Sequence, residues 1–143
     1  MKPPPNELAR KVLDAVLVRH PEWSAYATIQ EGGDLELAVP APATSRAGHL
    51  VISTSRGQDT WLRYSPPHMF YAVEDTSELL SVIEALLEDE AFFVVVTEDG
   101  SWVETTLIRP TDEVTIKPSQ CAQVVSWSGD HDDSLGAVLG DGV

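Results

Sequence analysis

The sequence predicts an α+β fold in which two helices pack on one antiparallel, twisted sheet of about six to seven strands, in the order α-ββ-ββ-α-ββ-β. Three observations predict this class. Two segments repeat apolar residues every three to four positions, which is typical of amphipathic helices. Several short segments alternate apolar and polar residues, as strands with one buried face do. Glycine-containing dipeptides separate neighbouring strand segments, as in β-hairpins.

The first helix is expected from Asn6 to about His20. Asn6 is a favourable N-cap residue because its side chain can accept a hydrogen bond from a free backbone N–H of the first turn. Pro21 ends the helix, since the residue before a proline is disfavoured in the helical conformation. Residues 1–5, which contain three consecutive prolines, form a stiff leader ahead of the domain.

Four strands are expected between this helix and the next. Gly32-Gly33 separates the first two strands, and Arg56-Gly57 separates the second two, as in β-hairpins. The two prolines of SPPH (residues 65–68) end the pattern, because proline cannot donate to the ladder of a central strand. The expected strands are residues 23–31, 35–40, 49–55 and 59–64.

The second helix is expected to begin at Asp75, which can act as its N-cap. Glu78, three residues later, completes a pair that resembles a capping box. At the carboxyl end stand Glu88, Asp89 and Glu90, where the helix dipole disfavours negative charge by a few tenths of a kcal/mol each. Stability of the fold does not explain these three acids, so we expect them to contact a partner.

The last hairpin is expected to join residues 92–98 to residues 101–108 through Asp99-Gly100, a dipeptide that favours a two-residue turn. A regular turn of this kind places Phe93 and Trp102 on the same face of the hairpin. This face combines large aromatic side chains with a carboxylate. It is therefore expected to be either half covered by a helix or open to a partner.

The chain is expected to form a single domain over residues 6–128, which ends with a strand at residues 122–127. Residues 129–143 are rich in glycine and aspartate and are expected to form a flexible tail. The N-terminus lacks the apolar segment of a signal peptide. The single cysteine, Cys121, excludes an internal disulfide. A cytoplasmic location is therefore expected.

The net charge of −14 is distributed unevenly along the chain. Residues 1–73 balance seven acids with seven bases, whereas residues 74–143 hold sixteen acids against Arg109 and Lys117. Residues 74–104 contain ten acids and no lysine or arginine. Such a field disfavours nucleic acids and anionic membranes as partners and favours a basic protein. The alternative is that the charge only keeps the protein soluble.

Motifs for catalysis or cofactor binding were not found. None of the four histidines lies three or four residues from another histidine or a cysteine, and the sequence contains no GxSxG, GxGxxG or GxxxxGK. We therefore expect no metal and no cofactor. One segment, RYSPPHMFY (residues 63–71), has the composition of a recognition site. It is either a pocket or a rigid connection whose aromatic residues pack at the sheet edge. The pocket residues would be Arg63, Tyr64, His68 and Tyr71.

Three segments resemble small acidic bacterial proteins of the immunity type, which accompany secreted polymorphic toxins. These segments are GHLVISTSRGQDTWLRYSPPHMFY (residues 48–71), DGSW (residues 99–102) and SWSG (residues 126–129), and the resemblance extends over residues 48–130. Phe70 stands where the loop of that pattern often has a second histidine, so no role for paired histidines is implied. The resemblance implies a toxin–antitoxin pair in which an acidic surface neutralises a basic toxin.

Three functions stay open at this point. The first is a non-enzymatic protein-binding module, an immunity protein whose partner is a basic toxin. The second is a small-ligand-binding or enzymatic domain with its pocket at residues 63–71. The third is a subunit of a homo-oligomer, such as a homodimer, that associates through the face of Phe93 and Trp102. The residues expected to contact a protein partner are Glu84, Glu88, Asp89, Glu90, Phe93, Glu98, Asp99 and Trp102.

Overall fold

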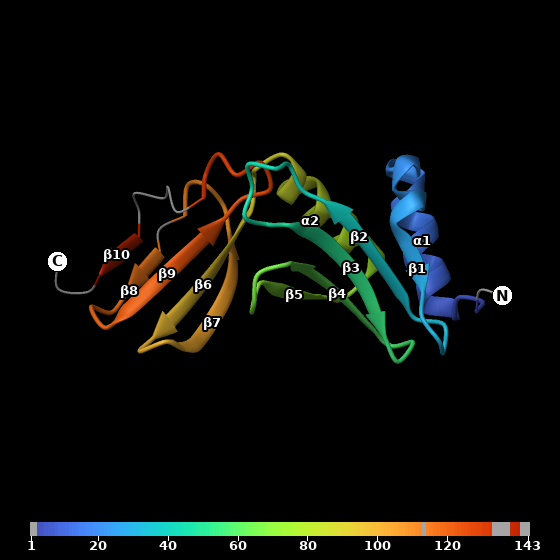
Figure 1. Cartoon of the computed structure of the whole chain (residues 1–143), viewed down its shortest axis with the longest axis horizontal. Coiled ribbons are helices and arrows are strands. Elements are labelled where there is room, and N and C mark those ends of the chain that lie inside the picture. The colour runs from blue at the N-terminus through green and yellow to red at the C-terminus, as the bar shows by residue number, and fades with distance from the viewer. Residues whose placement is uncertain (1–2, 113, 133–137, 141–143) are drawn as a thin grey trace.

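The computed structural model describes residues 3–112, 114–132 and 138–140. In this part of the chain the fold is α+β, as predicted (Figure 1). The helical elements are α1 (Glu7–Arg19), the 3₁₀ helix η1 (Pro21–Tyr26) and α2 (Thr76–Leu87). The strands are β1 (Ala27–Ile29), β2 (Leu35–Pro40), β3 (His49–Ser55), β4 (Asp59–Tyr64), β5 (Phe70–Val73), β6 (Phe92–Glu98), β7 (Ser101–Ile108), β8 (Val114–Ile116), β9 (Gln120–Val125) and β10 (Val138–Gly140).

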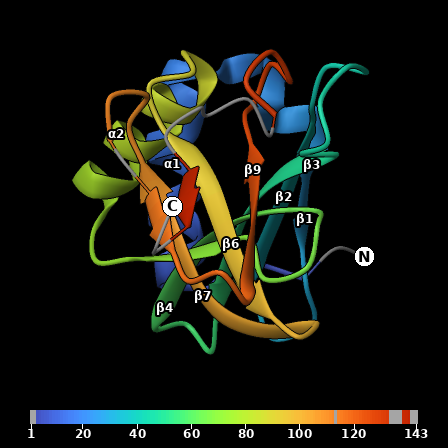
Figure 2. The same cartoon turned by 90° about the vertical axis from the view of Figure 1, so that its left-hand side faces the viewer.

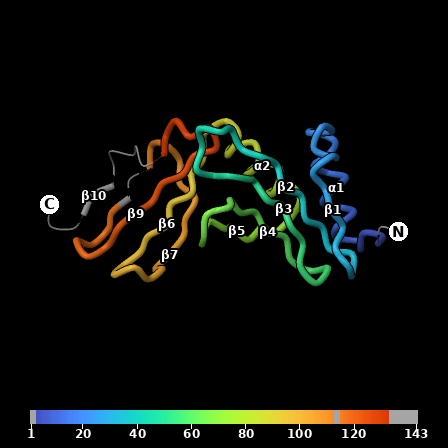
Figure 3. The backbone as a smooth tube through the Cα atoms, viewed as in Figure 1, coloured from blue at the N-terminus to red at the C-terminus, as the bar shows by residue number. Residues whose placement is uncertain are grey.

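The prediction of a single sheet is wrong, because the strands form two antiparallel sheets. The first has the order β1-β2-β3-β4-β5, and the second has the order β7-β6-β9. A separate parallel pair consists of β8 and β10. The tube in Figure 3 shows the two sheets side by side, with α1 and β9 toward opposite ends of the molecule. Because β6 pairs with β7 on one side and with β9 on the other, β6 has no free edge with which β5 could pair.

Both α-helices begin at the predicted N-caps. The side chain of Asn6 accepts a hydrogen bond of 2.8 Å from the backbone N–H of Ala9. In α2, Asp75 accepts one of 2.8 Å from the N–H of Glu78. The Glu78 carboxylate accepts a hydrogen bond of 3.0 Å from the N–H of Glu74, one residue before the N-cap, so the predicted pair is formed with a shift of one residue from a standard capping box.

The main core lies between these helices and the inner face of the first sheet. Strands β2, β3 and β4 place Leu37, Ile52 and Leu62 opposite one another on this face, and all three are fully buried. From the second sheet, Phe93 and Val95 of β6 join the same core. Burial of this continuous apolar layer is the main favourable contribution to folding.

Strand β6 is buried on both faces. Residues 92–96 are all buried, and Phe92 and Val94 belong to a second, smaller core on the other side of the sheet. Figure 2 shows β6 in the middle of this sheet, between β7 and β9. A strand covered on both sides has a continuous apolar run rather than an alternating pattern, and AFFVVV (residues 91–96) is such a run.

The β6–β7 hairpin has the predicted turn but a different register beyond it. Thr97 lies opposite Trp102, as a two-residue turn requires, but Val96 then lies opposite Glu104. Val103 is the extra residue of a β-bulge, so every later pair is displaced by one residue from the regular hairpin.

Other differences concern short elements. Trp23 lies in η1 and not in a strand, because Pro21 starts a helical turn there and the Trp23 ring stacks on His20 with a centroid distance of 4.0 Å. Strands β5, β8 and β10 were not predicted. The last predicted strand is two residues too late, since β9 ends at Val125.

The region after β9 is tied to the first sheet. Ser45 Oγ donates to the carbonyl oxygen of Ser126 at 2.8 Å, and Thr44 Oγ1 donates to that of Ser128 at 3.0 Å. Asp132 accepts a hydrogen bond of 2.7 Å from the N–H of Ser126. The bonds of Ser45 and Thr44 join a loop and a turn that are more than 80 residues apart in the chain.

The predicted tail, residues 129–143, is described only in part. Residues 129–132 form a turn that is hydrogen-bonded to Ser126, and β10 pairs with β8. The remaining residues, 133–137 and 141–143, lie outside the described part of the chain. In the residues that the structure does describe, neither α-helix has the length and apolar character needed to cross a bilayer.

Candidate functional site

Four aromatic side chains form a cluster at the junction of the two sheets, which we call the aromatic surface: Trp61, His68, Phe70 and Trp102. The rings of His68 and Trp102 are stacked, with centroids 5.3 Å apart. Phe70 lies 6.0 Å from both Trp61 and Trp102. Phe70 is 39% exposed and Trp102 is 44% exposed. Large apolar side chains gathered at the surface are typical of interaction sites.

The strand register explains how β4 and β5 contribute to this surface. Side chains alternate between the faces of a strand, so Leu62 of β4 points into the core whereas Trp61 points to the outer face, away from the helices. On β5 the same alternation directs Phe70 outward and Val73 inward. Trp61 and Phe70 are therefore diagonal neighbours on the outer face.

The loop between β4 and β5 holds His68 in a defined position. His68 has a φ of 68°, in the left-handed region that is uncommon for residues other than glycine. The next residue, Met69, is 1% exposed and belongs to the main core. The backbone N–H of Tyr64 donates to the carbonyl oxygen of Met69 at 2.9 Å. A buried anchor therefore lies directly beside the exposed imidazole.

A hydrogen-bond relay connects Trp102 to this loop. Trp102 Nε1 donates to Thr105 Oγ1 at 2.9 Å, and Thr105 Oγ1 donates to the carbonyl oxygen of His68. Since the only polar atom of the indole is occupied, the exposed part of the Trp102 ring is apolar. The relay also fixes β7 against the loop, so the aromatic surface is formed without the help of a ligand.

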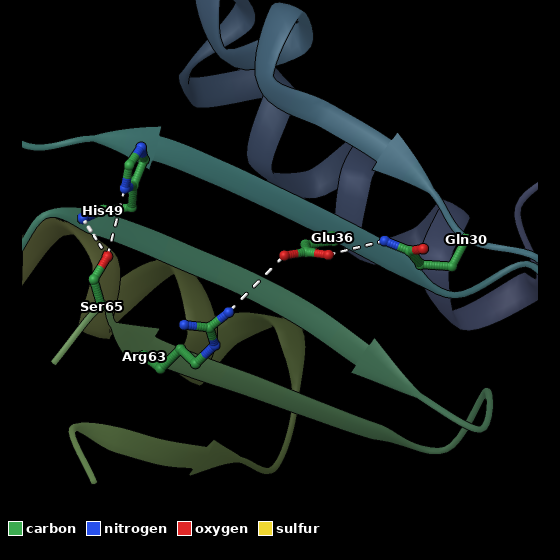
Figure 4. A network of polar contacts seen from close by, with 5 residues as sticks. All are labelled: Gln30, Glu36, His49, Arg63 and Ser65. Carbon is green, nitrogen blue, oxygen red and sulfur yellow. Dashed lines mark hydrogen bonds and ion pairs between the residues drawn. The ribbon is translucent and has the colours of Figure 1, made fainter. Parts of the chain in front are cut away.

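Beside the aromatic surface, the outer face of the first sheet carries a polar network (Figure 4). Arg63 of β4 reaches across β3 to Glu36 of β2, with 3.9 Å between Nη2 and Oε1. Gln30 donates to the other oxygen of Glu36 at 2.8 Å. In Figure 4 these side chains lie on one side of the sheet and the helices on the other. At this exposure the ion pair contributes about 0–1 kcal/mol to stability.

The four residues of the predicted pocket at residues 63–71 do not converge. Arg63 lies on the outer face, whereas Tyr64 is 1% exposed in the core and meets Phe93 edge to face at 4.8 Å. Tyr71 also points inward, toward α2. Only His68 faces the solvent at the aromatic surface.

The two tyrosines have raised pKa values for related reasons. Burial is the main cause for Tyr64, and the negative charges of Asp89 and Asp132 add to it. The Tyr64 hydroxyl has no hydrogen-bond partner among the described residues. For Tyr71, burial comes first and the charge of Glu78 second. Both hydroxyls stay protonated at neutral pH, so neither supplies a general base.

Phe93 cannot be a surface anchor, and this part of the prediction is wrong. Its side chain is fully buried between the two sheets. One face of the hairpin was expected to be buried and the other amphipathic. The first sheet covers the expected amphipathic face at Phe93 and Val95. Trp102 lies beyond this covered region, near the turn, and therefore stays exposed.

Three of the predicted contact acids, Glu84, Asp89 and Glu98, have partners within the chain. Glu84 Oε1 lies 2.7 Å from His20 Nε2 and so connects α2 to the end of α1. Asp89 has a φ of 56°, follows α2 at the position where glycine is most common, and accepts a hydrogen bond of 3.2 Å from the N–H of Ser128. The unexplained acid at position 89 thus has a structural role.

The predicted acids near the two ends of β6 do not form one patch. Glu88 and Glu90 are exposed at the start of β6, whereas Glu98 and Asp99 stand at its far end. Glu98 accepts a hydrogen bond of 2.7 Å from Ser119. A strand of seven residues spans roughly 20–23 Å, so the two groups are separated by the length of β6.

Trp61 was not among the site residues predicted from the sequence, whereas Phe70 lay within the predicted segment of residues 63–71. The alternation of Trp61 and Arg63 with Leu62 and Tyr64 was a usable signal, because it predicts two large side chains on the face opposite the core. The neighbourhood of Trp102 was not predictable in this way, since it depends on how the two sheets meet.

Among the described residues, no three histidine, cysteine, aspartate or glutamate side chains are grouped so that they could hold a metal ion. A scan of protein-family models finds no family that matches this chain, and searches among curated proteins and among solved structures find no match either. The resemblance to immunity-type proteins therefore stays a hypothesis.

Proposed function

We propose that this protein is a non-enzymatic protein-binding module and that the aromatic surface is the centre of its contact area. The observation that supports this most directly is the exposure of Phe70 and Trp102 within a four-ring cluster built by both sheets. Tryptophan is among the residues that contribute most binding energy at protein interfaces. Arginine is also enriched among these residues, and Arg63 is 45% exposed on the same outer face.

The rigidity of the surface favours binding. Trp102 is held by the relay through Thr105, and His68 is held by the buried Met69 beside it. Ordering a free side chain on binding costs about 0.5–1.5 kcal/mol. Side chains that are already ordered avoid most of this cost.

The proposed partner is a basic protein. The net charge of −14 attracts cationic surfaces, and Glu88, Glu90 and Asp99 remain exposed. Electrostatic steering of this kind raises association rates by about 10- to 1,000-fold. The resemblance noted in the sequence suggests a toxin as the partner and an immunity role for this chain.

The alternative of a ligand pocket or active site at residues 63–71 has lost its geometric basis, since Arg63 and Tyr64 point to opposite faces of the sheet. Self-association through Phe93 and Trp102 is weakened as well, because Phe93 is buried. A homodimer that uses only the aromatic surface would be detected by light scattering.

The test is affinity capture of the partner from source cells with the wild-type protein, Trp102→Ala and Val18→Ala. Val18 is 83% exposed on α1 and serves as a control for loss of an exposed apolar side chain. We expect wild type and V18A to retain the same basic protein and to release it at high salt. Truncation of a central tryptophan costs about 2 kcal/mol or more, so W102A should bind roughly 30-fold more weakly in titration calorimetry. Equal binding by W102A and V18A would overturn the proposal.

A further inference from the structure

The outer face of β4 carries an exposed acid at the rim of the aromatic surface. Asp59, Trp61 and Arg63 alternate with core-facing residues of this strand and therefore point to the outer face. Two residues along a strand span roughly 6.5 Å, so the Asp59 carboxylate lies next to the Trp61 ring on the same face. Asp59 is exposed to solvent, whereas Trp61 is half-buried.

The Asp59 carboxylate lacks a counter-charge. On the same face, the charge of Arg63 is paired with that of Glu36. Within the described part of the chain, no hydrogen bond or ion pair reaches the side chain of Asp59. The charge beside Trp61 is therefore negative, and it is not balanced by the basic residue two positions further along the strand.

The rings next to Asp59 are inclined to one another. The plane of Phe70 makes an angle of 68° with that of Trp61 and of 44° with that of Trp102. Because neither pair is stacked face to face, aromatic faces stay free for a ligand group. The imidazole of His68 stacks on Trp102, so it lies toward the second sheet and not beside Asp59. The ring surface nearest to the acid is that of Trp61 and Phe70.

A partner that covers this surface must also pair the Asp59 carboxylate. Contact removes water from the rings and from the acid beside them, and a buried charge without a partner is costly. A purely apolar side chain would match the rings but would leave this cost in place. A basic side chain removes most of it, because its apolar stem can lie on the rings while its charged end reaches the acid.

Of the basic side chains, arginine fits this arrangement better than lysine. The guanidinium group is planar, stacks on aromatic faces and is more weakly hydrated than an ammonium group. It can also donate two parallel hydrogen bonds to one carboxylate. A cation within about 6 Å of a ring centroid is attracted by the ring face, and this attraction is strongest for tryptophan.

We infer that Asp59, Trp61 and Phe70 bind an arginine side chain of the partner. The guanidinium group lies against the Trp61 ring and pairs with the Asp59 carboxylate, and the aliphatic stem packs on Phe70. This inference rests on the function proposed above and adds the chemistry by which a basic partner is recognised.

The first test is a titration with N-acetyl-arginine amide, followed by the NMR signal of the Trp61 indole N–H. The control is N-acetyl-citrulline amide, which has the same shape but carries a neutral urea group in place of the guanidinium. At constant ionic strength, we expect the arginine probe to shift this signal in a saturable way and to bind about 10-fold more tightly than the citrulline probe. Equal affinities, or no saturable shift with the arginine probe, would rule the inference out.

The second test compares Asp59→Asn with Asp14→Asn in the same titration. Both acids are exposed and both variants remove one negative charge, but Asp14 lies on α1, on the helical side of the first sheet. Asparagine keeps the shape of the side chain, and the Asp59 carboxylate bonds to no described residue, so D59N should fold normally. We expect D59N to weaken the arginine probe about 5-fold or more and D14N less than about 2-fold. Equal effects would show that the probe senses only the net charge, which contradicts a site at Asp59.

These outcomes separate the two proposals. If W102A loses the captured partner while both the citrulline comparison and the comparison of D59N with D14N are negative, the protein-binding function stands and arginine recognition is wrong. If the arginine probe binds at Trp61 and depends on Asp59 but W102A retains the partner, the arginine site stands and Trp102 is not the centre of the contact area.

Discussion

Asp34 organises one end of the first sheet. Its carboxylate accepts hydrogen bonds from the side chain of Asn6 at 2.9 Å and from the backbone N–H groups of Arg56 and Gly57 at 2.9 and 3.0 Å. Thr54 Oγ1 donates a fourth bond at 3.1 Å. A single side chain thus joins the start of α1, the β1–β2 turn and the β3–β4 turn.

These bonds lower the pKa of Asp34 below 3.8, with the Asn6 bond as the largest cause and the Gly57 bond next. A carboxyl with a lowered folded-state pKa adds stability above its unfolded pKa and loses it as pH falls through the folded value. We expect the wild type to be more stable than Asp34→Asn at neutral pH and the difference to shrink below about pH 4. Urea unfolding at a series of pH values measures this difference in the free energy of unfolding. A difference that is constant with pH would contradict the expectation.

Gly129 of the SWSG motif has a packing role. Its φ is 85°, and a Cβ atom at this position would lie 2.4 Å from the carbonyl oxygen of Thr44. Gly100 in the β6–β7 turn has a similar φ of 80°, but its Cβ would meet nothing within 4 Å. Alanine substitutions at the two positions therefore distinguish the cost of an unfavourable φ, which both share, from the cost of a steric contact, which only Gly129 has.

We expect Gly129→Ala to lower the free energy of unfolding by about 3 kcal/mol and Gly100→Ala by about 1 kcal/mol. Both variants adopt an unfavourable φ, but only G129A must also displace the Thr44 loop. Denaturant titration monitored by circular dichroism measures both. Similar losses in the two variants would show that the contact at Thr44 is easily relieved.

At the scale of elements, Thr105 connects the two sheets through Trp102 and His68. Thr105→Val keeps the shape of the side chain but removes both hydrogen bonds, at a cost of about 1–2 kcal/mol. The neighbouring Thr106 is exposed, so Thr106→Val should change stability by less than about 0.5 kcal/mol. Thermal unfolding compares the two.

A second readout separates the role of Thr105 in the site from its role in stability. If the relay positions Trp102, T105V should also weaken partner binding, whereas T106V should not. A variant that loses stability but binds normally would show that the stacking of Trp102 on His68 suffices.

The starts of the two α-helices could be predicted from the sequence, because each depends on residues that are close together in the chain. Asn6 and Asp75 bond to residues three positions ahead, so their capping roles followed from the sequence. The division into two sheets did not follow, because it depends on whether β6 pairs with β5 or with β9. The continuous apolar run of residues 91–96 was the available clue, since it indicates a strand covered on both faces.

In the candidate site too, features set by residues close together in the chain were easier to predict than contacts between distant segments. Trp102 was predicted to be an anchor because a regular turn at Asp99-Gly100 places it on the amphipathic face of the hairpin. Phe93 was assigned to the same surface, and only the packing of the two sheets at Tyr64 shows that it is buried. Contacts between distant segments were the part that the sequence left open.

At the scale of the whole molecule, the charge of −14 should govern how fast the partner associates. We expect the association rate measured by stopped flow to fall by about 10-fold or more between low and physiological salt, with a much smaller change in the dissociation rate. The W102A variant should show the opposite pattern, because loss of a buried contact mainly raises the dissociation rate. A salt-independent association rate would mean that the acids serve solubility alone.

The bonds from Thr44 and Ser45 to the turn after β9 have a consequence for synthesis on the ribosome. The first sheet and α2 can leave the exit tunnel and begin to pack while Ser126 and Ser128 are still untranslated. At roughly 5–20 residues per second, the 81 residues between Ser45 and Ser126 take several seconds to appear. During that interval Thr44 and Ser45 lack these two acceptors, and the edge of β6 that pairs with β9 is open. Phe92, Val94 and Val96, which pack against Val124 of β9, therefore stay exposed until the last strand emerges, and this face of β6 is where a chaperone would act.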